Sequence, residues 1–313
     1  MVSSLLHSFN AVAVVLILTS CGYLCSALGW IKPDAKIFLS KYLMRFAVPV
    51  MCVYSLRTNL TIELLRTSWK LLLIPTVTSI VLYVTAGMIG KRLHLLPRQN
   101  SVFRLMCSVS NAMFIGYSMC MELFGESCVP YVMLYYLINT AFVQLVGVSG
   151  IRRSAGQGSR GLGAEVLAFF KTPAILGVLF GVLVILFDLT LPSVLMTCAR
   201  YINNTVTPLA LITAGNVIHG IGLKNLRLNR TVSIVMGFRF LLAPVICFSL
   251  CLLLHVTGLA RNVLVIQTAM PVLTQTVVAA TEYGGDEELA AQGIAISTLA
   301  CFIVIPALML LLR

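Results

Sequence analysis

Apolar residues gather into runs of about 20 along the chain, and short polar stretches separate the runs. A run of this length crosses a hydrocarbon core of about 30 Å as one helix. The first run has no basic residue before it and no small-residue cleavage site after it, which favours a first span over a removed signal peptide. The pattern therefore predicts an all-α polytopic membrane protein, with ten spans near 9–29, 36–56, 70–90, 102–123, 129–150, 167–187, 194–218, 231–257, 262–282 and 289–312.

Composition agrees with a bilayer as the solvent. Of the 313 residues, 59% are hydrophobic and only 10% are charged, too few charges for a soluble domain of this length. The net charge of +12 comes largely from clusters in three alternate loops (residues 91–104, 152–171 and 224–230). By the positive-inside rule these loops are cytoplasmic, which places both termini outside a plasma membrane. The basicity is thus explained by topology, and no nucleic acid partner is expected.

The chain also resembles itself. Gly22, Pro33 and Pro49 have the same spacing as Gly181, Pro192 and Pro208, at an offset of 159. "KLLLIP" at 70–75 matches "RFLLAP" at 239–244, and "LFGE" at 123–126 matches "YGGD" at 283–286. These matches, in order, indicate two halves of five spans. Because five is odd, the halves enter the membrane from opposite sides and form an inverted repeat, an arrangement common among secondary transporters.

Two polar stretches interrupt the apolar pattern at equivalent places in the halves. "SNAMFIGYSM" (110–119) lies in the fourth span, and "MPVLTQTVVA" (270–279) lies in the ninth. Pro271 removes a helix hydrogen bond in the ninth span. In the fourth span, Gly116 loosens the backbone and the Ser118 hydroxyl can bond a freed carbonyl. A helix is broken within hydrocarbon only where protein or a water-filled cavity covers the gap. We therefore predict two broken helices that cross near the midplane.

At these residues the chain resembles the auxin efflux carrier family. The motifs are Ser110-Asn111, Phe114 and Gly116 in the fourth span, Met270-Pro271, Thr274 and Gln275 in the ninth, Val48-Pro49 in the second and "TPLALITAG" in the seventh. The usual proline of the fourth span is replaced by Ser118, which leaves open how sharply that span is broken. The resemblance implies the ten-helix fold of bile-acid symporters and sodium/proton antiporters, with repeats at 1–151 and 167–313 and a cytoplasmic linker at 152–166.

The candidate binding residues are the polar and helix-breaking positions within these spans. They are Ser110, Asn111, Gly116, Asn139, Gln144, Pro271, Thr274 and Gln275. A buried amide is costly unless it is hydrogen-bonded, so each has either a ligand or a structural partner, and both alternatives stay open. Gln267 is a weaker candidate of the same kind. No metal site, cofactor or catalytic residue is predicted.

The charged residues exclude some alternatives. None of the ten acids lies at the centre of a predicted span, which argues against a cationic substrate. Arg45 and Arg239 lie toward span ends, and we expect both to reach the membrane interface. His219 and His255 are expected there too.

These features favour a secondary-active transporter of small organic anions, with carboxylates as the expected class. Half-helix N-termini, which carry partial positive charge, would attract the anion. The alternatives are an intramembrane enzyme and a substrate sensor that kept the transporter fold. The expected partners are the anion and the lipid bilayer; a coupling ion, Na⁺ or H⁺, and a homodimer stay open.

Overall fold

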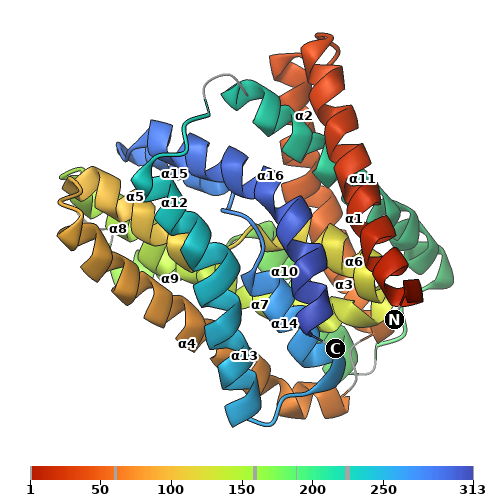
Figure 1. Cartoon of the computed structure of the whole chain (residues 1–313). Helices are drawn as coiled ribbons and strands as arrows, with labels where there is room; N and C mark the ends of the chain where they lie inside the picture. Colours follow the sequence, from red (N-terminus) through yellow and green to blue (C-terminus); the bar gives the residue numbers. More distant parts are fainter. Residues whose placement is uncertain (1, 60–61, 158–160, 188, 223–225, 313) are drawn as a thin grey trace.

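Helices account for nearly all of the regular structure in the described residues. The computed structural model describes residues 2–59, 62–157, 161–187, 189–222 and 226–312, and its one β feature there is an isolated antiparallel bridge between Ser110 and Val272. Figure 1 shows the helices packed into one bundle around the broken segments. The prediction of an all-helical fold is confirmed.

The elements follow the predicted spans closely. The first half contains α1 (Val2–Ala27), α2 (Pro33–Tyr42), η1 (Leu43–Ala47), α3 (Val48–Asn59), α4 (Ile62–Arg92), α5 (Pro97–Ser108), η2 (Ala112–Tyr117), α6 (Ser118–Phe124), η3 (Glu126–Cys128), α7 (Val129–Phe142), η4 (Val143–Val148) and α8 (Ser149–Ser154). The second half contains α9 (Leu162–Phe170), α10 (Pro173–Leu186), α11 (Ser193–Ile221), α12 (Arg230–Gly237), η6 (Phe238–Leu242), α13 (Ala243–Leu253), α14 (Gly258–Thr268), α15 (Gln275–Tyr283) and α16 (Glu287–Leu311).

Six helices in the described residues are long and apolar enough to cross a membrane. They are Asn10–Ala27, Pro33–Asn59, Ser68–Arg92, Glu126–Ser154, Arg230–Leu253 and Glu287–Leu311. The bent pair α9 and α10 makes a seventh if it is counted as one span. The fourth and ninth predicted spans fall outside this set because each is broken, and α11 is long but carries polar residues such as Asn203, Asn204 and Asn216.

The sixth span differs from its prediction as a single straight helix. α9 and α10 meet at an angle of 68° across Lys171 and Thr172. Pro173 is the first residue of α10, and Thr172 before it has extended backbone angles. A residue that precedes proline is biased away from the helical region, so the chain turns here.

Two other prolines are accommodated without a break. Wide π-helical turns, η1 and η6, directly precede the helices that contain Pro49 and Pro244. Proline cannot donate to the carbonyl four residues earlier and its ring crowds that carbonyl. A π-helical turn shifts the hydrogen-bond register by one residue, which keeps the helix continuous past the proline.

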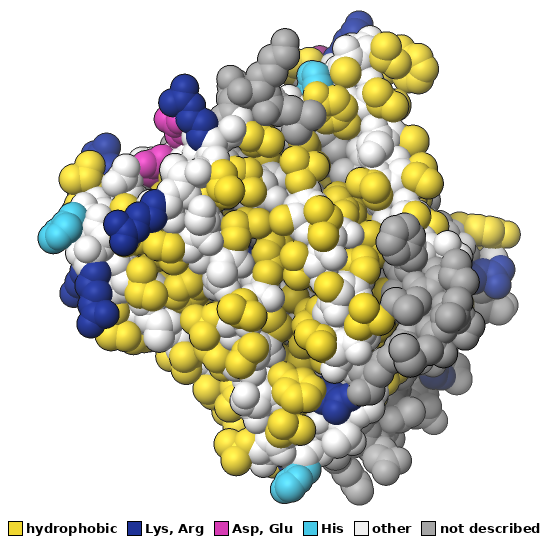
Figure 2. Space-filling model, in the orientation of Figure 1, with side chains coloured by type: hydrophobic (Ala, Val, Ile, Leu, Met, Phe, Trp, Pro, Cys, Tyr) yellow, Lys and Arg dark blue, Asp and Glu magenta, His cyan; other side chains and the backbone are white. Residues whose placement is uncertain are grey.

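The outer surface and the interior have the polarity expected in a bilayer. Figure 2 shows hydrophobic side chains over the centre of one face and most Lys and Arg side chains near its edges. Inside, one hydrophobic cluster lies among α1, α3, α6, α7, α11 and α14, and a second lies among α4, α5, α12 and α16. Residues 109–111 of the first break and 269–272 of the second are buried among these clusters, and Leu273 and Thr274 are partly buried.

Candidate functional site

The two broken segments contact each other through their backbones. In the fourth span α5 ends at Ser108, and the helix resumes at Ala112. The backbone N–H of Asn111 donates to the carbonyl of Pro271 at 2.8 Å, beside the bridge between Ser110 and Val272. Each break therefore satisfies part of the other's backbone, as a low-dielectric environment demands.

Asn139 on α7 completes the first break. Its Nδ2 donates to the carbonyl of Ser110 at 2.9 Å, and its Oδ1 accepts from the N–H of Ser110 at 3.1 Å. The Ser110 hydroxyl lies 2.9 Å from the hydroxyl of Tyr135. One side-chain amide thus pairs with both the backbone N–H and the backbone C=O of one residue, in the way that a residue on a neighbouring strand would.

Asn111 uses both ends of its side chain within the protein. Its Oδ1 accepts from the backbone N–H of Phe114 at 3.3 Å and caps η2. Its Nδ2 donates to the Thr274 hydroxyl at 3.0 Å, across to the ninth span. The side chain is 1% exposed. These bonds account for a structural role, and a role in substrate binding stays a prediction.

The second break spans six residues, Ala269–Thr274, between α14 and α15. It contains Pro271 as predicted, whereas the first break precedes Gly116 and Ser118, the positions that the sequence favoured. Those two lie in the wide turn η2 and at the start of α6. The Ser118 hydroxyl does donate to a neighbouring carbonyl, that of Phe114, at 2.9 Å.

The prediction that Arg239 reaches the membrane interface was wrong. Its side chain is 1% exposed and donates three hydrogen bonds, two to the Met270 carbonyl in the second break and one to the carbonyl of Thr268, the last residue of α14. Arg239 lies in η6, five residues before Pro244, where the sequence shows only a basic residue near a span end. The bonding capacity of the unwound carbonyls keeps it inside. Arg45, by contrast, is exposed.

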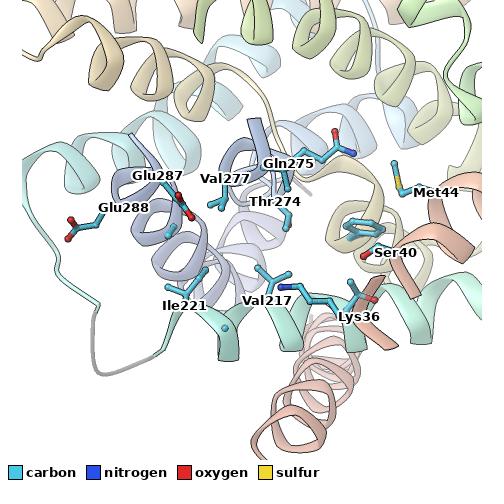
Figure 3. A pocket seen from close by; sticks show the side chains of 15 residues that line it. Lys36, Ser40, Met44, Val217, Ile221, Thr274, Gln275, Val277, Glu287 and Glu288 are labelled. Atoms are coloured by element: carbon cyan, nitrogen blue, oxygen red, sulfur yellow. The ribbon is translucent and has the colours of Figure 1, made fainter. Parts of the chain in front are cut away.

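A cavity of about 740 Å³ leads from the surface to the second break (Figure 3). It lies between α2, α11, α15 and α16, and its lining residues are Lys36, Ser40, Met44, Phe114, Thr213, Val217, Gly220, Ile221, Thr274, Gln275, Val277, Val278, Glu287, Glu288 and Ala291. In Figure 3, Glu287 and Glu288 lie toward one end, and Lys36, Ser40 and Met44 lie toward the other. Thr274 and Gln275, at the N-terminal end of α15, lie between them.

A smaller cavity of about 50 Å³ adjoins the first break. Its lining includes four of the predicted residues: Asn111, Asn139, Gln144 and Gln275. Met44 and Phe114 line both cavities, so the two spaces are neighbours. Ser110, Gly116 and Pro271 line neither cavity; they are buried where the broken segments meet.

The sequence reasoning missed one wall of the large cavity. Lys36, Ser40 and Met44 lie at spacings of four residues and so share one face of a helix. The first two of these residues are polar, and polar residues on one face at the start of an apolar span were a signal that could have been found. Within the described residues, no cluster of three His, Cys, Asp or Glu side chains could hold a metal ion.

Comparisons with known proteins address the whole chain. A family model described as membrane transport protein matches residues 7–159 and 163–309. An uncharacterized transporter of Methanocaldococcus jannaschii is 27% identical over 301 residues, which cover 95% of this chain and 96% of the relative. An uncharacterized transporter of Methanothermobacter thermautotrophicus is 25% identical over 307 residues, 96% of each chain. The chain is therefore a multi-pass membrane protein that belongs to the membrane transport protein family, the auxin efflux carrier family whose motifs its sequence carries.

Proposed function

We propose that this protein is a secondary-active transporter of small organic anions, with carboxylates as the substrate class. The observation that carries the proposal is that the large cavity ends at Phe114, Thr274 and Gln275, where the two broken segments meet. Broken helices at the centre of a transporter are where substrate sites form. Alternating access would expose this site first to one side of the plasma membrane and then to the other.

The charge pattern of the cavity supports an anion. α15 begins at Gln275, so the partial positive charge of its N-terminal end lies at the inner part of the cavity. Lys36 adds a full positive charge to the lining of the same cavity. The two acids, Glu287 and Glu288, begin α16 and lie toward the other end of the cavity in Figure 3. An anion would therefore be drawn toward α15.

Helix packing supports the inverted repeat of five plus five spans. α1 packs along α11, and α10 packs along α3, which are equivalent pairs if the first and second spans correspond to the sixth and seventh. A Cβ on Gly22 would lie 2.2 Å from the carbonyl oxygen of Ile212, and a Cβ on Gly181 would lie 3.4 Å from the Cα of Val53. These glycines, and these two contact residues, are both related by the offset of 159.

Two histidine turns support the same repeat. His94 after α4 and His255 after α13 both have positive φ, at 53° and 55°. In each turn the His N–H bonds the carbonyl three residues back, and the next N–H bonds the carbonyl five residues before it. Positive φ is uncommon outside glycine, so its recurrence at an offset of 161 is a second correspondence.

Transport by the purified protein in sealed proteoliposomes tests the function. Uptake of acetate, benzoate, succinate or malate against matched amines should show at least one carboxylate and no amine carried. Uptake of an amine alone would contradict the anion proposal. An enzyme or a sensor would carry none of these solutes in vesicles of verified orientation.

Cysteine labelling tests the topology in the same proposal. In a background without the native cysteines, Gln157→Cys should react only from the cytoplasm and Ser127→Cys only from outside. Both positions are exposed, so a missing reaction reports sidedness rather than burial. Labelling of both from the same side would contradict the five-plus-five arrangement and the outside location of both termini.

A further inference from the structure

Arg239 is the largest fully buried side chain of the protein in the described residues. Its Nε donates to the carbonyl of Met270 at 3.0 Å, and its Nη2 donates to the same carbonyl at 2.7 Å. Nη2 also donates to the carbonyl of Thr268. Thr268 is the last residue of α14, and Met270 lies in the second break. The guanidinium therefore lies directly at the C-terminal end of a half-helix.

The charge of this guanidinium is matched by dipoles rather than by an acid. Within the described part of the chain its hydrogen-bond partners are these carbonyls and the neutral Tyr135 hydroxyl, and the C-terminal end of α14 adds partial negative charge. A buried charge without compensation costs several kcal/mol. Arginine also stays protonated in proteins, so this positive charge is permanent.

Unwound carbonyls and half-helix C-terminal ends are where transporters with broken helices coordinate a coupling cation. Here the same type of position is filled by a side chain. The N–H groups of Arg239 point to the carbonyl oxygens of Met270 and Thr268. The guanidinium therefore places a positive charge beside several carbonyl oxygens, as a bound cation would. A metal cation and the guanidinium would compete for the same oxygens.

We propose that Arg239 is a tethered cation that holds the second break closed in place of a coupling metal ion, so that transport requires no Na⁺. The inference rests on the proposed transport function for its consequence on coupling. The inference also states that the second break is stable only with a cation beside its carbonyls, and that Arg239 is this cation. This part concerns the stability of the protein and is measurable without a known substrate.

The first experiment measures the thermal unfolding of purified protein in buffers that contain choline, Na⁺ or millimolar guanidinium. Wild-type protein should have the same melting temperature in choline and in Na⁺. Arg239→Ala should melt lower, and guanidinium or Na⁺ should raise its melting temperature selectively. Arg45→Ala is the control, because Arg45 also lies shortly before a proline, Pro49, but is exposed. Added cations should affect this variant no differently from wild type.

The second experiment measures uptake of the carboxylate panel in proteoliposomes. Wild-type uptake should be equal in Na⁺ and in choline, Arg239→Ala should lose at least about tenfold, as for loss of a hydrogen bond to a charged group, and guanidinium should restore part of it. Arg239→Lys keeps the charge and should remain independent of Na⁺.

Three results would overturn the inference: stabilisation of wild type by Na⁺, Na⁺-dependent wild-type uptake, or an Arg239→Ala variant that neither loses stability nor responds to cations. If Arg239→Ala cannot be purified, Arg239→Lys tests the same role. A melting temperature of Arg239→Lys near that of wild type would support the inference, whereas loss of its stability would show that charge alone is insufficient and would overturn it. If none of the carboxylates is carried, the transport proposal fails while the melting measurements still test the cation role.

Discussion

The two helix breaks perform the same structural task with different chemistry. The first break, Val109–Asn111, contains no proline and is closed by neutral side chains, chiefly Asn139 and Asn111. The second, Ala269–Thr274, contains Pro271 and is closed by the charged guanidinium of Arg239 and by the Ser297 hydroxyl, which accepts from the Val272 N–H at 3.0 Å. Matched sequence positions in the two halves therefore do not imply matched local electrostatics.

This difference assigns different roles to the two sides of the site. The neutral first break has its amides beside the small cavity, where they can meet a ligand. The second break concentrates positive charge at the end of α14, and the N-terminal end of α15 adds more. We expect substitutions at the first break to alter stability and recognition separately, and this expectation orders the following predictions.

The largest effect is expected at Asn139. Asn139→Ala would leave the buried N–H and C=O of Ser110 without partners, and each such group costs about 1–3 kcal/mol, so the loss should be about 2–6 kcal/mol of unfolding free energy. Denaturant unfolding in detergent measures this loss. Asn10→Ala, at an exposed amide of α1, is the control and should change little. Equal losses in both variants would contradict the role of Asn139.

Substitution of Asn111 separates support of the break from substrate binding. If Asn111 binds the anion, Asn111→Ala should weaken affinity about 10- to 150-fold, since a hydrogen bond to a charged ligand contributes about 1.5–3 kcal/mol. Asn111→Asp retains the acceptor for the Phe114 N–H but places negative charge beside the anion, so it should weaken binding at least as much. Lower pH should partly restore the Asp variant by neutralising its carboxyl.

Affinity and melting temperature measured on the same Asn111 variants give the decision. A purely supporting role predicts a lower melting temperature with normal affinity. The bonds to Phe114 and Thr274 show why this outcome would have a physical basis.

A smaller effect is expected at Gly116, where η2 packs closely against the side chains of Gln267 and Met270. A Cβ on Gly116 would lie 2.4 Å from the Gln267 Oε1 and 3.0 Å from the Met270 Cγ. Gly116→Ala should therefore destabilise the protein by about 1–3 kcal/mol, as overpacking does. Gly237→Ala is the matched control, because nothing lies within 4 Å of its Cβ position; it should stabilise the helix by about 0.4–1 kcal/mol. The same sign for both variants would contradict close contact at Gly116.

The smallest effect is expected for Ser118, which stands where the family usually has proline. Ser118→Ala removes one hydrogen bond to the Phe114 carbonyl and should reduce stability by about 0.5–1.5 kcal/mol. Ser233→Ala removes an equivalent bond at an exposed site and serves as the control. A loss of several kcal/mol in Ser118→Ala would mean that Ser118, rather than Asn139, is the main stabilising side chain at the first break.

The helical character of the chain and the positions of most helical segments could be predicted from the amino-acid sequence. Runs of about 20 apolar residues predicted an all-helical chain, because the length of such runs follows from helix geometry and hydrocarbon thickness. Helices lie in each predicted span, although α1 and α4 begin several residues before theirs. Polar stretches interrupt the apolar pattern near both breaks, and Pro271 lies within the second one. Asn139 was a candidate binding residue, with a structural hydrogen bond as the alternative. The sequence could not name the partner, since the backbone N–H and carbonyl of Ser110 lie 29 residues away in sequence.

The tertiary structure decided the rest, above all where charge and space lie. Arg239 and Arg45 are similar in sequence, each a basic residue before a proline, yet one is buried and the other exposed. The difference depends on whether unpaired carbonyls of another helix come within reach, which no local pattern records. The cavity wall formed by Lys36, Ser40 and Met44 likewise exists only because α2 packs near α11, α15 and α16. Sequence thus determined the apolar segments that form helices, whereas packing determined where the first break lies and which charges and cavities the two breaks share.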